Sequence, residues 1–374
     1  MLLHLPSNRD EHWRWSDFSA LPALAESAPT GEVPVELPWI DSDRAGPRLL
    51  FVDGVFVAER SEPGEVQVSA PHYVPGQPLA DLAAREAGAG YVIALGKDAA
   101  ASGIVQIVHV STGGAAHLSN RIVLEADAQA SVVETYVGSG WSNATSVFEL
   151  NKAARLMRVV RVLKDGGVHT DFAMASVGEA ASFDTVALVA GADSARIETG
   201  IVIAGEGAYA EAGGALLARG SQKLEGVTVL RHGVANGTSR QVWRSVADDR
   251  STCSVAARVE VARHAQKTDG EQSLKGLLLD RAAQINAKPE LEIFADDVKC
   301  AHGATVGELD RNALFYLESR GITPDEAKAM LTRTFVADAL DRIGEEDVRV
   351  ACYADVERWF SQDSFVPSEV EGRA

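Results

Sequence analysis

Between Val168 and Val306 the chain carries short runs of β-branched and aliphatic residues and no convincing helical period. These runs recur about every 10–15 residues between Gly, Asp and Asn, as strands joined by turns would. Parallel strands of a doubly wound sheet need helical crossovers, so the pattern excludes that fold. A sandwich, a barrel and a β-solenoid remain. Small turn residues and short Val/Ile/Ala runs favour the solenoid modestly, although no repeat of fixed length is visible.

The rest of the sequence divides around this β-rich region, which we place at residues 47–307. Residues 1–46 contain several prolines, so we expect a partly helical N-terminal segment with short elements, anchored to the core by Trp13 and Trp15. Residues 308–374 form a C-terminal helical region.

Helix signals in the C-terminal region are specific. Asp310 is placed to cap a helix over Arg311–Arg320, which Gly321 ends. Thr323-Pro324-Asp325-Glu326 offers a Thr cap, a first-position Pro and a capping-box Glu for a second helix, and a third follows over about 345–360. The second helix places Leu331, Phe335 and Leu340 on an apolar face. That face either caps the core or docks a partner.

Charge and cysteine content restrict the function. The formal net charge is −18 and we find no basic patch, which argues against nucleic-acid or membrane-surface binding. The three cysteines are widely spaced and include no Cys-x-x-Cys pair. The first residues become polar too early for a signal peptide, and no apolar run approaches the ~20 residues of a membrane span. We therefore expect a cytoplasmic protein.

Cys300 and His302 form the one close Cys–His pair in the sequence. If this stretch is extended, both side chains point to the same side, with their Cα atoms roughly 6.5–7 Å apart. Thiolate and imidazole both suit iron and zinc, but zinc needs three or four ligands and iron–sulfur clusters usually four. The pair is therefore half of a ligand set, completed by distant residues or another chain, or a buried thiol beside a hydrogen-bonded histidine.

Enzymatic chemistry has weaker support. The sequence has no Gly-x-x-x-x-Gly-Lys-Ser/Thr loop, so the chain is not itself a P-loop ATPase. Asp296 and Asp297 would diverge on a strand, which makes a paired-carboxylate site unfavourable. A carbohydrate-acting β-helix enzyme is the main alternative, but it would need clustered carboxylates and aromatic platforms, and aromatic residues are 6% of the chain.

From Lys288 to Gly321 the sequence resembles the core motif of the SufB/SufD family, and within it the SufD form with Cys-x-His-Gly-Ala-Thr at residues 300–305. The segment Arg9–Asp17 is similar to the family's early Arg/Glu/Trp-Arg segment. Position 301 is Ala where the family often has Ser. The family also usually has a longer helical region before this N-terminal segment.

The resemblance implies a right-handed parallel β-helix between helical termini. It implies a scaffold subunit for iron–sulfur cluster assembly that pairs with SufB through the β-helix ends and receives SufC ATPase subunits on its C-terminal helices, here assigned to Leu331, Phe335 and Leu340. Sulfur would come from a cysteine desulfurase, and a reduced flavin (FAD) is associated with the complex. His302 matches the family's interface histidine and Cys300 the neighbouring thiol, so iron or a cluster would lie there transiently. A metal-binding homodimer is the remaining alternative.

Overall fold

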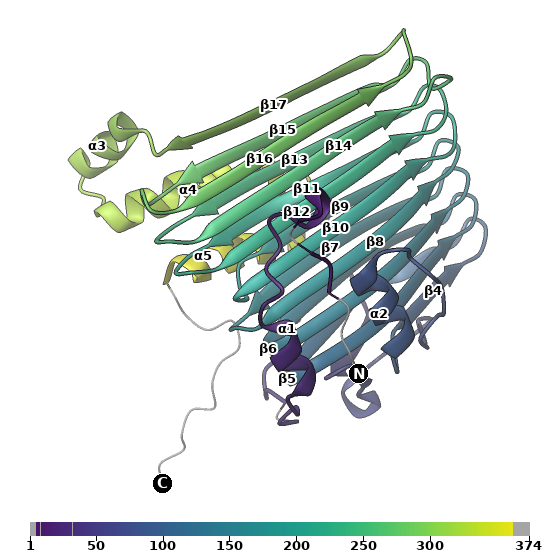
Figure 1. The fold of residues 1–374 in the computed structure, drawn as a ribbon. Coiled ribbons are helices and arrows are strands. Elements are labelled where there is room, and N and C mark those ends of the chain that lie inside the picture. Colours follow the sequence, from purple (N-terminus) through teal and green to yellow (C-terminus); the bar gives the residue numbers. More distant parts are fainter. Residues whose placement is uncertain (1–4, 8, 32, 362–374) are drawn as a thin grey trace.

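The computed structural model describes residues 5–7, 9–31 and 33–361 and is mainly β, with 49% strand and 18% helix. Its body is a parallel β-solenoid of about seven turns with helices at the C-terminal side, which confirms the predicted fold class and excludes the sandwich (Figure 1). Within the described residues, no helix combines the length and apolar character needed to cross a membrane.

Two walls of parallel strands make up the solenoid, and most turns give one strand to each. One wall contains β1 (Ala45–Val52), β7 (Arg155–Lys164), β9 (Ser182–Val189), β11 (Tyr209–Ala218), β13 (Thr238–Ala247), β15 (Asp269–Leu278) and β17 (Lys299–Glu308). The other contains β4 (Tyr91–Leu95), β8 (Val168–Val177), β10 (Ser194–Ile203), β12 (Lys223–His232), β14 (Thr252–Val261) and β16 (Gln284–Ile293). Two short strands, β2 (Val55–Phe56) and β3 (Gln67–Val68), pair antiparallel with β1 and β4.

Two long strands, β5 (Ala100–Leu124) and β6 (Gln129–Leu150), run through both walls. They bend where Gly114 and Gly140 adopt φ angles of 64° and 90°. A Cβ on Gly140 would lie 2.8 Å from the carbonyl carbon of Gly113 in the adjacent turn. Glycine is therefore required at this stacked corner, because a side chain would meet backbone that cannot yield.

Successive turns differ in length. In one wall Val168 pairs with Ser194, Ser194 with Lys223, and Lys223 with Thr252, which in turn pairs with Gln284. The intervals grow towards the C-terminal end because the connecting loops lengthen. This variation explains why the sequence shows strands at irregular spacing and no fixed repeat.

The interior follows the alternation of each strand. Inward positions stack from turn to turn and form one continuous apolar core, which includes Phe148, Phe183, Ile197, Leu216 and Trp243. Near the N-terminal end this core also encloses a buried ion cluster. Arg158 Nε lies 2.6 Å from Glu134 Oε2, and Arg158 Nη2 lies 3.0 Å from Asp171 Oδ2. Burial raises the pKa of Asp171 above its ordinary value, while the Arg158 guanidinium opposes that rise.

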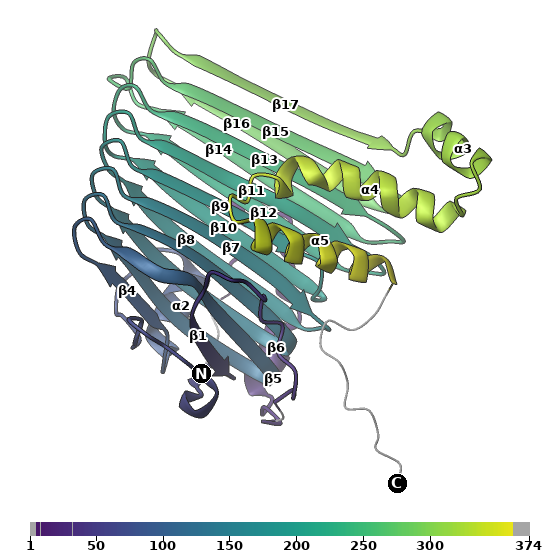
Figure 2. The same cartoon turned by 180° about the vertical axis from the view of Figure 1, so that it is seen from behind.

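Helices cover the outside of the walls. α4 (Pro324–Leu340) packs on β9, β11 and β13, and α5 (Glu346–Ser361) lies beside it (Figure 2). α3 (Arg311–Ser319) projects beyond the end of β17. The expected caps are present, since Asp310 accepts from the backbone of Asn312 and Thr323 forms a capping box with Glu326.

The N-terminal half holds one helix that the sequence did not predict. α2 (Pro78–Glu86) lies within the stretch assigned to β structure and contacts β5, β6 and β8. The expected short elements of the N-terminal segment are a 3-10 turn at Glu11–Trp13 and α1 (Leu21–Glu26). A second 3-10 turn spans Ala58–Arg60. Trp13 is buried with Phe18, Leu21 and Trp141, as an anchor should be.

Candidate functional site

Cys300 and His302 lie on β17, the last strand of the solenoid. They occupy alternate positions, pairing with Gly270 and Gln272 of β15, and therefore face the same way. Cys300 packs against the cluster of Val259, Val261, Ala265 and Ala295, so this face points into the solenoid interior. The structure thus brings the two predicted ligands together on the inner face of its final turn.

The solenoid is open at this end. β17 pairs with β15, and within the described chain no strand lies on its other side. Apolar residues that earlier turns would bury are consequently exposed, with Ile293 at 39% and Val306 at 44%. His302 itself is exposed, whereas Gln272, one turn earlier in the same inward column, is 1% exposed.

The backbone of β17 adds to this open end. The N–H of Lys299 donates to the carbonyl of Thr268 at 2.8 Å, towards β15. Because N–H groups alternate sides along a strand, those of Cys300 and His302 face the unpaired edge. The two candidate ligands therefore lie where backbone groups and side chains are both available to another molecule.

The Cys300 thiol is half-buried. Burial raises its pKa above the ordinary thiol value, and the charge of Asp269 adds to that rise. The sulfur lies close to Gly270, where a Cβ would be in ordinary van der Waals contact with Sγ at 3.5 Å. A metal ion would have to displace the proton of this thiol on binding.

The pair does not form a complete metal site by itself. Among the described residues, no group of three or more His, Cys, Asp or Glu side chains is placed to hold a metal ion. The other two cysteines, Cys253 and Cys352, are buried at separate places in the solenoid core and in α5.

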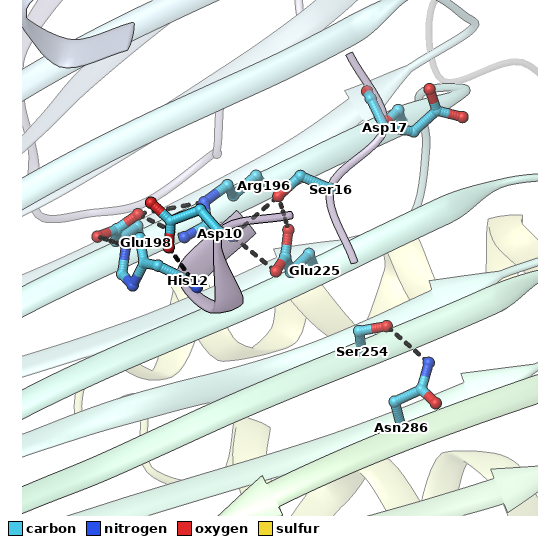
Figure 3. Close-up of polar contacts among 10 residues, drawn as sticks. Asp10, His12, Ser16, Asp17, Arg196, Glu198, Glu225, Ser254 and Asn286 are labelled. Atoms are coloured by element: carbon cyan, nitrogen blue, oxygen red, sulfur yellow. Dashed lines mark hydrogen bonds and ion pairs between the residues drawn. The ribbon is translucent and has the colours of Figure 1, made fainter. Parts of the chain in front are cut away.

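A second polar cluster, which sequence reasoning missed, ties the N-terminal segment to the outer face of β10 and β12 (Figure 3). Arg196 lies between Glu198 and Glu225, at 2.8 and 2.6 Å. Ser16 donates to Glu225 at 2.5 Å, and His12 lies 2.8 Å from Glu198. Although burial opposes it, the His12 hydrogen bond and the nearby Arg196 hold the pKa of Glu198 below its ordinary value.

Register explains this cluster. Arg196, Glu225, Ser254 and Asn286 follow one another across β10, β12, β14 and β16 as one outward column. Beside the column, a groove of about 320 Å³ lies under the N-terminal segment. Its charges are mixed, with Arg14, Arg258 and Lys288 set among carboxylates. The alternation of charge in Arg196-x-Glu198 was the available sequence signal, but their N-terminal partners are about 180 residues away.

The three residues assigned to partner docking on α4 differ in position. Leu331 and Phe335 are half-buried, and Phe335 packs against the outer face of the solenoid. Leu340 is 0% exposed and belongs to that packed layer, so it cannot contact a partner while α4 stays in place. The end of α4 therefore turns its apolar face onto the wall, and the docking role predicted for Leu340 stays a prediction that would require α4 to move. The exposed part of the helix carries Met330, at 49%.

Comparison with known proteins gives a consistent result. The family model described as "SUF system FeS cluster assembly, SufBD core domain" matches residues 107–335, more than half of the chain. The chain is 27% identical over 370 residues to the iron–sulfur cluster assembly protein SufD of Escherichia coli (strain K12). This match covers 92% of this chain and 87% of the relative. It is 24% identical to an iron–sulfur cluster assembly SufBD family protein of Synechocystis, over 91% and 84%. A SufBD family protein of Mycobacterium tuberculosis is 28% identical over 64% of this chain and 62% of its own length.

Proposed function

This chain belongs to the SufBD core family of the SUF iron–sulfur cluster assembly system, as a SufD-type member, and we propose that it acts there as a non-catalytic scaffold subunit. In this role it pairs with SufB in the cytoplasm and docks the SufC ATPase, which supplies ATP hydrolysis in trans. The observation that carries the proposal is the open end of the solenoid, where Cys300 and His302 lie on β17, a strand with no partner on its outer edge within the described residues.

The open end supports pairing with a second chain of similar fold. An unpaired strand edge is a template for another strand, and soluble proteins normally cover or shorten such edges. β17 instead presents ten residues of edge, with exposed apolar side chains at Ile293 and Val306 beside it. SufB would continue the walls of the solenoid and bury these side chains.

The cluster is the cargo of this interface. Cys300 and His302 provide one soft sulfur ligand and one imidazole, a donor set that suits iron. Iron–sulfur clusters usually require four protein ligands, so SufB would provide those that this chain lacks. Sulfur would arrive from a cysteine desulfurase. The groove under the N-terminal segment is of mixed charge, and we assign the reduced flavin of the complex to no residue of this chain.

SufC would dock on the exposed side of α4. A groove of about 390 Å³ there is lined by Ile322, Glu326, Ala329, Met330, Arg333 and Glu357. Leu331, the residue after Met330, is half-buried, and Phe335 packs against the apolar layer beneath the helix. α4 rests directly on β9, β11 and β13, so movement of the helix would reach the walls that end at β17.

Coexpression with SufB and SufC tests the ligand role. The complex would carry His302→Ala, with Thr305→Ala as the matched control on the outward face of the same strand. We expect His302→Ala to lower the iron and acid-labile sulfide bound per complex, and Thr305→Ala to leave both unchanged. Equal cluster content in the His302→Ala complex and the natural one would contradict the proposed role of His302.

A further inference from the structure

A short ladder of glutamine amides leads through the solenoid interior to the open end. Gln241 of β13 and Gln272 of β15 are register partners, and both are buried. Gln241 Nε2 donates to the backbone carbonyl of Arg258 at 3.0 Å. Gln272 Nε2 donates in turn to Gln241 Oε1, also at 3.0 Å. The next member of this inward column is His302.

The direction of the ladder is fixed at its inner end. A backbone carbonyl only accepts hydrogen bonds, so Gln241 must present its NH₂ group to Arg258 and its oxygen to Gln272. Gln272 must then present its NH₂ group to Gln241. Turning the Gln272 amide over would place two oxygens against each other, which removes a hydrogen bond and adds repulsion.

These two hydrogen bonds leave one amide oxygen of the ladder, Gln272 Oε1, without a donor. It is buried and has no hydrogen-bond partner among the described residues. A buried acceptor left without a donor destabilises a protein, so such an atom in a folded chain usually has a functional or structural reason. The ladder leaves this oxygen for the next turn, where the inward side chain is His302, and register neighbours on adjacent strands are about 4.8 Å apart.

In this structure the exposed His302 ring makes no hydrogen bond with Gln272 Oε1. We propose that Gln272 is a positioning residue for His302, whose imidazole turns inward and donates one ring N–H to Gln272 Oε1. A neutral imidazole has one donor nitrogen and one acceptor nitrogen. Fixing the donor towards Gln272 leaves the lone pair of the other nitrogen directed away from the ladder, towards the open end. Metal-binding histidines usually donate their second nitrogen to such an acceptor, which sets the tautomer and the ring orientation.

The inference rests on the proposed function in one respect, namely that His302 binds iron or a cluster. The orientation of the ring is a property of this chain alone. Gln272 supplies an acceptor from a rigid wall and does not contact the metal. Loss of such a partner typically weakens metal binding by about 10–100-fold, which is the expected effect of Gln272→Met on iron affinity in the SufB complex.

The decisive measurement is the tautomer of His302 in the full, metal-free chain, read from the ¹⁵N shifts and two-bond couplings of ¹⁵N-labelled histidine above the titration range of the ring. The His302→Ala variant identifies the signal. The natural chain should show one tautomer. Gln272→Met, which keeps the side-chain length and removes the acceptor, should show the mixture typical of an exposed imidazole.

Either of two results overturns the inference. One is a tautomer mixture at His302 in the natural chain, which needs no variant to fold. The other is a single tautomer that persists in Gln272→Met. Failure of the proposed function is a separate outcome, because it would appear as unchanged iron content in the His302→Ala complex while the tautomer still depends on Gln272.

Discussion

Replacing Arg158 with methionine should destabilise the solenoid strongly, because it leaves two carboxylates in the interior without a cation. Arg158 and Glu134 are fully buried, and Asp171 is 3% exposed. The guanidinium is shared by both carboxylates, at 2.6 Å from Glu134 and 3.0 Å from Asp171. Methionine keeps much of the side-chain volume and removes the charge.

The magnitude follows from these contacts. Two unit charges about 4 Å apart attract by roughly 4 kcal/mol at an effective dielectric constant of about 20. The two attractions together offset the desolvation of three buried ions, and without the cation that desolvation has no compensation. Removing one partner of a buried pair typically destabilises by about 3–5 kcal/mol, which is the loss expected for Arg158→Met at neutral pH.

The loss should depend on pH in a defined direction. In the variant, burial without a cation raises the pKa of Asp171 in the folded state further above the unfolded value of about 3.9. Carboxyl groups with raised folded pKa values favour folding below the unfolded values and oppose it as pH rises through the folded ones. The destabilisation should therefore be largest at neutral pH and should shrink towards pH 4.

Urea unfolding followed by tryptophan fluorescence at pH 7.5 and pH 5 measures this effect. Arg155→Met is the matched control, because Arg155 lies on the same strand and is exposed. The triple variant Arg158→Met/Glu134→Gln/Asp171→Asn should recover much of the loss, since it buries no charge. The reasoning is refuted if Arg158→Met unfolds at the same urea concentration as Arg155→Met, or if its loss is equal at both pH values.

Three further predictions concern the outer elements. Thr323→Ala should remove the capping box of α4 and reduce helix stability by about 1 kcal/mol. Hydrogen exchange in the first turn of α4 should become faster, and unchanged exchange would contradict this prediction. Leu340→Ala should destabilise the chain by about 2–5 kcal/mol in thermal unfolding, because the side chain is fully buried. Met330→Ala should leave stability unchanged and weaken SufC binding. Equal stability losses in the two variants would contradict the distinction between a buried Leu340 and an exposed Met330. Hydrogen bonds from Lys223 and Ser19 lower the pKa of Asp17 to about 2, so its contribution is present above the unfolded pKa and is lost as pH falls towards 2. Lys223→Met should raise that pKa in an NMR titration, and an unchanged value would exclude the contact.

The fold could be predicted from the sequence in class but not in detail. Short strand-like runs without helices between Val168 and Val306 excluded the doubly wound fold, and the family resemblance selected the solenoid. Turn lengths vary, so no repeat marked the register. α2 was missed because its nine residues, rich in Ala, lie among strand-like segments and their burial depends on contacts with β5 and β6.

The candidate site, like the fold, could be predicted only where the sequence decides the geometry locally. Strand alternation was enough to place Cys300 and His302 on one face, because that relation is local. Gln272 could not be linked to His302 from the sequence, since the pairing depends on the length of the loop between β15 and β17. The burial of Leu340 under α4 could not be predicted for a related reason: a helical period shows that a face is apolar, but not whether a wall or a partner covers it.

Backbone hydrogen exchange in β17 tests the central claim most directly, that the open end of the solenoid is where SufB joins. Mass spectrometry would compare the chain alone with the chain bound to SufB, and α2, at the other end of the solenoid, is the internal reference. The account predicts that the amides of residues 300–306 become protected on binding, because those on the unpaired edge gain partners. Unchanged exchange in β17, with protection elsewhere on the chain, would contradict it.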